Sequence, residues 1–150
     1  MNSQLIVKRA KDPDGERCFQ IRREVFIEEQ NVPEELEFDE YDATALHFIA
    51  FNCVKDKNHA VATATVLIKE DGKTAKIGRV AVLKQARGMG VGKQLMQEIE
   101  RSPELANVTN LILEAQTHAV SFYEKLGYRA QGDEFMDVGI PHFRMIKIVA

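Results

Sequence analysis

Three glycines within five residues separate two different patterns in the middle of the chain. Before them, Lys76 to Leu83 is rich in β-branched and apolar residues, which indicates a strand. After them, apolar residues recur every three or four positions and predict an amphipathic helix; they are Val91, Leu95, Met96 and Ile99. A strand that leads into a glycine-rich helix start is typical of phosphate-binding loops, because the first N–H groups of a helix lack partners and lie at the positive end of its dipole. We therefore expect Gly88, Gly90 and Gly92 to let an anion approach the backbone.

Two phosphate-binding motifs fit this stretch poorly. A P-loop requires glycine at position 87 and serine or threonine at position 94, where this chain has Arg87 and Gln94. A Rossmann fingerprint requires a third glycine where Lys93 stands, although Glu114 would suit its ribose-binding acid. A glycine-rich helix cap without any ligand is the structural alternative, and it costs about 1 kcal/mol for each glycine inside the helix.

A third pattern, Q-x-x-G-x-G, is matched by Gln85, Gly88 and Gly90. It resembles the coenzyme A signature of the GNAT superfamily of N-acetyltransferases, in which the backbone amides of such a loop hold the pyrophosphate. Arg87, inside the pattern, adds a cation to the predicted anion site.

Composition narrows the function classes. The length of 150 residues suits one domain, residues 1–150, and the charged fraction of 29% is ordinary for a globular protein. A net charge of −3 argues against a general nucleic-acid binder. Cys18 and Cys53 provide neither a disulfide framework nor metal-ligand spacing, so we predict two reduced thiols and no metal. We recognise no signal peptide or membrane span and expect a cytoplasmic protein.

The charge is unevenly distributed along the chain. The segment from Glu24 to Asp42 contains nine acidic residues and no lysine or arginine, so the remainder carries a net charge of +6. A basic remainder suits a polyphosphorylated cofactor, and an acidic rim would suit a cationic amine substrate. A solvated acidic loop explains the segment equally simply, and on charge alone that interpretation is favoured.

Periodicity and turn residues predict the order of the elements. We expect a short strand at Leu5–Lys8 and a helix from Pro13 to Glu29 that Asp12 or Asp14 caps. Three strands then precede the glycine helix, which argues against the βαβ start of a Rossmann fold; they are Ala45–Val54, His59–Lys69 and Thr74–Leu83. After the helix we expect a buried strand at Asn110–Ala115 and then a short helix that Thr117 caps. A strand starting at Tyr128, a loop at Phe135–Pro141 and a closing strand at His142–Val149 complete the chain.

A second motif, A-V-S-F-Y-E-K-L-G-Y at Ala119 to Tyr128, joins the glycine loop and the element order. Together they resemble the GNAT superfamily over nearly the whole chain. The outer segments I-R-R-E-V-F-I-E-E-Q-N-V-P and G-I-P-H-F-R-M are similar to a narrower branch, the small bacterial ElaA/YjcF-like acetyltransferases. The resemblance implies an α+β fold with a mixed, mostly antiparallel twisted sheet of six to seven strands and helices on both faces.

The resemblance also implies where acetyl-CoA, the co-substrate of that family, would bind. Two strands, here Lys76–Leu83 and Asn110–Ala115, would splay apart and admit the cofactor arm. The backbone of Val80, Ala81 and Val82 would pair with the pantetheine amides. The pyrophosphate would lie on Arg87, Gly88, Met89, Gly90, Val91, Gly92 and Lys93. Gln116 stands where many relatives have asparagine, and Phe122 and Tyr123 would line the thiol end.

The implied reaction is attack of a primary amine on the thioester, and it needs three further groups. A base must accept the amine proton, because an alkylamine has a pKa of about 10.4; Glu28 and His142 are the candidates. An N–H near Val82 would stabilise the oxyanion, and Tyr123 would protonate the leaving thiolate. A solvated glutamate, a strand-edge histidine and a core tyrosine are the structural alternatives.

The acceptor side is predicted only in outline. We expect a small-molecule or protein amine at Glu28, His118 and His142, and a monomer or homodimer; His118 on the plain surface is an equal alternative. A non-catalytic CoA-binding or protein-interaction module and a nucleotide-binding α/β protein are the competing classes.

Overall fold

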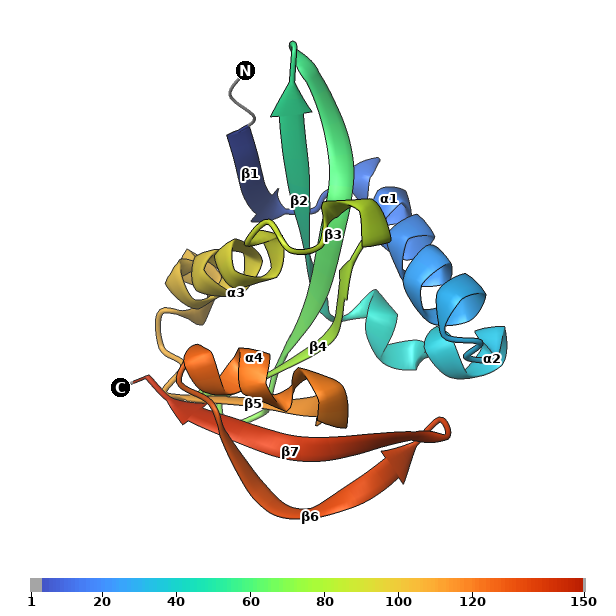
Figure 1. Cartoon of the computed structure of the whole chain (residues 1–150). Helices are drawn as coiled ribbons and strands as arrows, with labels where there is room; N and C mark the ends of the chain where they lie inside the picture. Colours follow the sequence, from blue (N-terminus) through green and yellow to red (C-terminus); the bar gives the residue numbers. More distant parts are fainter. Residues whose placement is uncertain (1–3, 150) are drawn as a thin grey trace.

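A computed structural model describes residues 4–149 and shows one seven-stranded sheet in the order β1-β2-β3-β4-β5-β7-β6 (Figure 1). The strands are β1 Gln4–Arg9, β2 Leu46–Val54, β3 Lys57–Ile68, β4 Thr74–Val82, β5 Asn110–Gln116, β6 Arg129–Asp137 and β7 Ile140–Ile148. Neighbours pair antiparallel except β4 and β5, which are parallel. The predicted fold class, a mostly antiparallel mixed sheet, is confirmed.

Helices cover both faces of the sheet (Figure 1). They are α1 Asp14–Arg22, α2 Glu34–Glu37, α3 Val91–Arg101 and α4 Val120–Lys125, with a π-helix, η1, at Arg23–Glu29 and short 3-10 turns, η2 to η5, at Glu40–Ala43, Lys84–Ala86, Pro103–Leu105 and Thr117–Ala119. The apolar face of α3, including Leu95 and Met96, joins the larger core cluster with Tyr123 of α4. Ile21, Val25 and other residues of α1 and η1 pack in a second cluster on the opposite face.

The sheet opens between β4 and β5. Their pairing covers only Thr74–Ile77 against Asn110–Leu113. Beyond Ile77 the register of β4 against β3 shifts, and Arg79 takes a left-handed φ of 50°. This is a bulge, which bends one strand away from its neighbour. Beyond Ile77, the edge of β4 that faces β5 therefore has no strand partner within the described part of the chain. The predicted splay of these two strands requires such an open edge.

The acidic segment is folded against arginines. Arg22 is completely buried, and its Nε lies 2.8 Å from Glu37 Oε2 while its Nη1 lies 2.7 Å from Asp42 Oδ1. Arg79 also reaches this group, at 3.5 Å from Glu37 and 3.3 Å from Asp39. The segment is thus a structural element that fastens α2 and η2 to α1 and to the bulge in β4, and the solvated-loop interpretation is wrong for these residues.

Three local predictions need correction. Pro13 occupies the N-cap of α1 without a side-chain hydrogen bond, so neither Asp12 nor Asp14 caps it, and the predicted helix changes to π geometry at Arg23. The η5 turn likewise starts without a side-chain cap from Thr117. The predicted loop at Phe135–Pro141 is almost entirely strand, because a two-residue turn suffices to join β6 to β7.

Replacing Arg22 by methionine should lower the free energy of unfolding by about 3–5 kcal/mol, because it leaves buried carboxylates without their cation. Arg23→Met is the matched control, since Arg23 pairs with Glu34 at the exposed surface and should cost at most about 1 kcal/mol. Urea denaturation measures both values. Equal losses would show that the buried network contributes no more than a surface pair.

Candidate active site

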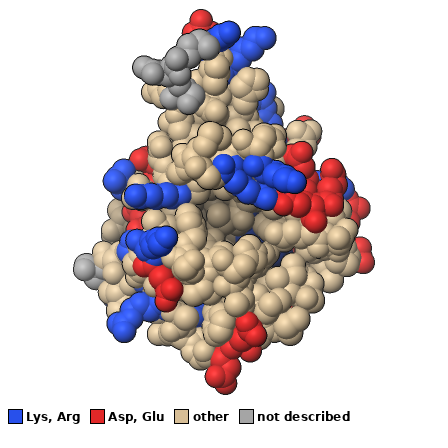
Figure 2. Space-filling model, viewed as in Figure 1, with Lys and Arg blue, Asp and Glu red and all other residues tan. Residues whose placement is uncertain are grey.

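The opening between β4 and β5 is a cavity of about 1080 Å³. Figure 2 shows its mouth as a hollow near the centre of the molecule with basic side chains along the rim. Phe122 and Tyr123 line it from the α4 side, whereas Val25 and Phe26 line it from η1 on the other face of the sheet. The cavity therefore passes through the sheet, and two ligands can meet inside it from opposite faces.

The open edge of β4 presents backbone groups to this cavity. Leu83 N–H donates to the Val61 carbonyl at 2.8 Å, so the alternation of an antiparallel ladder turns the N–H and C=O of Val82 away from β3. Ala81, opposite Thr63, bonds toward β3 instead. Val80 and Val82 line the cavity, and the geometry suits an extended ligand that pairs with this edge.

The glycine loop is a row of free backbone donors. Arg87 N–H donates to Lys84 and Gln94 N–H donates to Gly90, but within residues 4–149 the amides of residues 88–93 make no hydrogen bond. Gly88 and Gly90 have left-handed φ values of 79° and 78°, and a Cβ on either would meet nothing within 4 Å. Six N–H groups without partners at the start of an 11-residue helix are the donors that an anion would need.

The side chains of this loop differ from expectation. Arg87 is not a free cation: its Nη1 and Nη2 lie 2.6 and 2.7 Å from the Glu29 carboxylate, and its Nε donates to Val82 O at 2.9 Å. Hydrogen bonds from Arg87 lower the pKa of Glu29. Met89 is exposed, and its side chain and that of Gln85 face a separate depression. Lys93 is the loop cation that lines the cavity without an ion pair among the described residues.

Gly92 has a packing role. A Cβ at this position would lie 3.2 Å from Cζ of Phe122 and 3.7 Å from Cγ2 of Val82. The glycine therefore lets the first turn of α3 approach both β4 and α4. This close approach brings the free amides of the loop next to the side chains at the bottom of the cavity.

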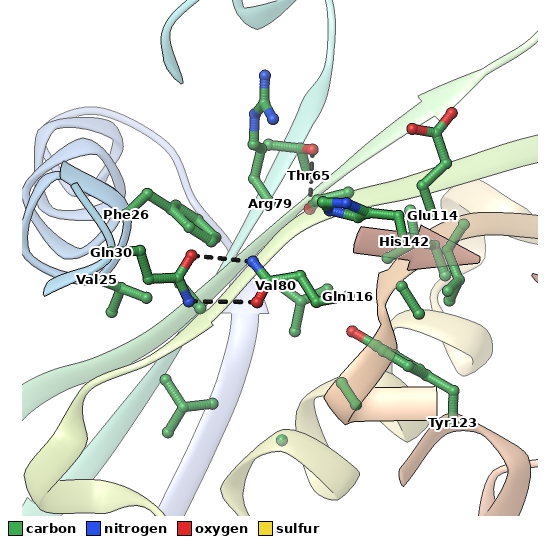
Figure 3. Close-up of a pocket in the computed structure, with 18 of the residues that line it drawn as sticks. Val25, Phe26, Gln30, Thr65, Arg79, Val80, Glu114, Gln116, Tyr123 and His142 are labelled. Carbon is green, nitrogen blue, oxygen red and sulfur yellow. Dashed lines mark hydrogen bonds between the residues drawn. The ribbon is translucent and has the colours of Figure 1, made fainter. Parts of the chain in front are cut away.

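Tyr123 lies at the bottom of the cavity with its side chain 7% exposed. Its ring packs edge-on against Phe122 and Tyr128, at centroid distances of 5.0 and 5.9 Å. Its hydroxyl makes no hydrogen bond with the described residues and points toward Val80 and Gln116 (Figure 3). Burial raises the pKa of Tyr123, so the phenol keeps its proton.

His142 of β7 is 7% exposed and lines the same cavity. Its Nδ1 lies 2.7 Å from the carbonyl oxygen of Ile140. A carbonyl only accepts, so Nδ1 carries a hydrogen, and Nε2 is the nitrogen that this contact leaves for another partner. Stacking on Phe135 at 5.9 Å holds the ring, which reaches toward the Thr65 and Arg79 side of the cavity in Figure 3.

Gln116 is already engaged by other side chains. It exchanges two amide hydrogen bonds with Gln30, at 2.9 and 3.5 Å, and its Oε1 lies 2.7 Å from Nε2 of His118 (Figure 3). These contacts bridge β5 and the end of η1 across the cavity. His118 is exposed and is among the residues that line the cavity.

Glu28, the other predicted base, does not line the cavity. It is exposed and is not among the residues that line the cavity, whereas Glu29 and Gln30 are. An α-helix would place Glu28, three residues after Val25, on the inner face. The wider π turn, closed by Gln30 N–H on Val25 O at 3.2 Å, rotates it outward.

Gln30 and Asp137 line the cavity but were not predicted from the sequence. Gln30 follows the assumed end of a helix, and Asp137 lies in a stretch that resembles a loop. The alternation of Phe135 and Asp137 before Gly139 is the signal that would have placed Asp137 on a strand.

Within the described residues no group of three metal-ligating side chains occurs, and no helix is long and apolar enough to cross a membrane.

Comparison with known proteins decides the family. Residues 9–149 match the model of the acetyltransferase (GNAT) domain. The chain belongs to the GNAT acetyltransferase family. YjcF of Bacillus subtilis, an uncharacterized N-acetyltransferase, is 41% identical over 131 residues, which cover 87% of this chain and 89% of YjcF. ElaA of Escherichia coli is 31% identical over 133 residues, which cover 87% of this chain and 84% of ElaA.

Solved structures agree with this assignment. The crystal structure of ElaA gives a TM-score of 0.78 at 27% identity, over 97% of this chain and 99% of that one. A GNAT family acetyltransferase from Elizabethkingia anophelis, solved with acetyl-CoA bound, gives a TM-score of 0.70 at 14% identity, over 97% and 98% of the two chains. The predicted family and fold are confirmed, and as a GNAT acetyltransferase the chain is an acyltransferase.

Tyr123 and the neighbouring Tyr128, which packs against it outside the cavity lining, should respond differently to loss of the hydroxyl. Tyr123→Phe should leave the free energy of unfolding within about 0.5 kcal/mol, because its hydroxyl has no partner. Tyr128→Phe should cost about 1–3 kcal/mol, because it removes the 3.0 Å hydrogen bond to the partly buried carboxylate of Glu100. Thermal or urea unfolding measures both, and a large loss in Tyr123→Phe would mean that its hydroxyl is structural.

Proposed function

We propose that this GNAT acetyltransferase transfers an acetyl group from acetyl-CoA to a primary amine by direct attack of the amine on the thioester. One observation carries the proposal: Tyr123, whose phenol keeps its proton, and His142, whose Nδ1 binds the Ile140 carbonyl, line one cavity that also reaches the free amides of the glycine loop. The cavity thus combines an anion site, an acid and a base. The reaction belongs in the cytoplasm, where acetyl-CoA is available.

The glycine loop and the β4 edge would hold the coenzyme. Residues 88–93 offer N–H groups to a pyrophosphate, and Lys93 adds a free positive charge at the cavity. The backbone of Val80 would pair with the amides of the pantetheine arm, as an added strand pairs with a sheet edge. Because Arg87 caps the Val82 carbonyl, the Val82 N–H is the group of that residue left to donate.

The chain's own groups would move the protons. The acceptor arrives as an ammonium, and Nε2 of His142 would accept one proton from it so that the neutral amine can attack; the histidine then releases this proton to solvent. The N–H of Val82 would stabilise the negative charge on the carbonyl oxygen. As the carbon–sulfur bond breaks, Tyr123 would give its proton to the thiolate, and the second proton that leaves the nitrogen would restore the phenol. Glu28 has no part in this proposal because it lies outside the cavity.

Gly90→Glu should abolish CoA binding, because a carboxylate side chain would enter the open space in front of the amides. Gly72→Glu is the control: Gly72 has a φ of 69° and equally open surroundings but lies in the β3–β4 turn outside the cavity. Both variants should lose roughly 1–2 kcal/mol of stability from the left-handed backbone. Calorimetry with CoA distinguishes them, and normal affinity in Gly90→Glu would refute the anion site.

Release of free thiol from acetyl-CoA across an amine library tests the reaction itself. With an amine that is turned over, Tyr123→Phe and His142→Gln should each lower kcat roughly 100-fold or more, since acid–base groups contribute on that scale. Acetyl-CoA affinity should change little. Absence of thiol release with every amine, despite tight CoA binding, would favour a non-catalytic CoA-binding module.

A further inference from the structure

Six carboxylates line the cavity, and five of them are neutralised by a cation of the chain. Glu29 pairs with Arg87, Glu37 with Arg22 and Arg79, Asp39 with Arg79, Asp42 with Arg22, and Glu114 with Lys76. Asp137 is the sixth: within residues 4–149 it forms neither an ion pair nor a side-chain hydrogen bond, although it is half-buried. A half-buried carboxylate without a partner is costly unless a ligand supplies one.

The strand register places Asp137 beside the proposed base. Phe135 pairs with His142 across β6 and β7, and Asp137 pairs with Ile140. Paired residues share a face, and so do residues two apart, so Asp137 and His142 point to the same side as diagonal neighbours. Such neighbours are roughly 7–8 Å apart, close enough for two ends of one small molecule.

The tip of this hairpin is held in place over the cavity. Val138 and Gly139 have left-handed φ values of 47° and 77°, as a two-residue type I′ turn requires. A β-branched residue is strained in this conformation. Val138 and Ile140 pack against the apolar cluster around Val25 and Phe26, which offsets the strain and fixes the position of Asp137.

We propose that Asp137 selects the acceptor: it binds a second cationic group on the amine substrate, so the preferred acceptor is a short diamine or a similar dication. This inference rests on the proposed function, because it assumes that the reacting nitrogen lies at His142. The competing charges are Lys69 and Lys93, which also line the cavity, but both lysines are exposed whereas Asp137 is half-buried. Because a half-buried charge is screened less by water, Asp137 attracts a second cation more strongly than an exposed lysine attracts a carboxylate. A dication is therefore favoured over an amino acid.

The test compares three probes of equal length: a four-carbon alkanediamine, the four-carbon alkylamine, and the four-carbon amino acid in which a carboxylate replaces the second amine. Calorimetry with and without CoA should show that the wild-type protein binds the diamine roughly tenfold or more tightly than the other two, as one charge-assisted hydrogen bond allows. Asp137→Asn should remove this preference. Asp133→Asn, on the same strand but outside the cavity, should keep it.

Turnover separates this inference from the proposed function. In Asp137→Asn the KM for the diamine should rise about tenfold at unchanged kcat, while the alkylamine is acetylated as in the wild type. If Asp137 were only structural, the variant would acetylate the diamine and the alkylamine less efficiently by the same factor. Equal binding of diamine and alkylamine by the wild type, preference for the amino acid, or a preference that survives Asp137→Asn would each overturn the inference. Diamine binding that depends on Asp137 without thiol release would instead overturn the proposed reaction and leave the binding site standing.

Discussion

The site depends on the point where β4 leaves β5. After Ile77 the two strands share no further hydrogen bonds, and the bulge at Arg79 bends β4 away. The bulge is not free to relax, because the Arg79 side chain is fastened to Glu37 and Asp39, and Glu37 is in turn fastened to the buried Arg22. A buried ion network contributes little net stability but penalises any arrangement that separates its members. The network thus fixes the open geometry of the sheet.

Different chemical groups line the opening on the two faces of the sheet. On the α3 and α4 side, the donors are backbone amides, which bind an anion without a titratable group and leave Tyr123 among apolar neighbours that keep it protonated. On the α1 and η1 side, the cavity is lined by ionisable side chains, and His142 lines the same cavity. Because the two sets lie on opposite faces of one sheet, an anion bound at the amides would be separated from the charged groups on the other side.

Local patterns predicted the parts of this site that depend on local structure. The apolar stripe on α3 follows from periodicity and is buried as predicted, and the glycine loop precedes this helix. The open edge of β4 was implied by the family resemblance, and its pairing with a ligand stays a prediction. Contacts between distant segments were beyond these patterns. Arg87 suggested a free cation, but its partner Glu29 is 58 residues away in the chain. Glu28 was a candidate base because it lies in the acidic segment, but the π-helical geometry of η1 turns it away from the cavity. Asp137 was not predicted because valine is unusual in the type I′ turn that follows it, where asparagine or glycine is typical, so no local pattern indicated a hairpin.

The distribution of charge shows why the composition of the acidic segment misled. Nine acids without a lysine or arginine suggest an attractive surface for an amine, yet Glu29, Glu34, Glu37, Asp39 and Asp42 are each paired with an arginine from outside that segment. A carboxylate held by a guanidinium presents little net field to a third ion, since the two charges nearly cancel at a distance. Selectivity for a cation therefore depends on which carboxylate lacks a partner and how deeply it is buried, and by both criteria the relevant group is Asp137.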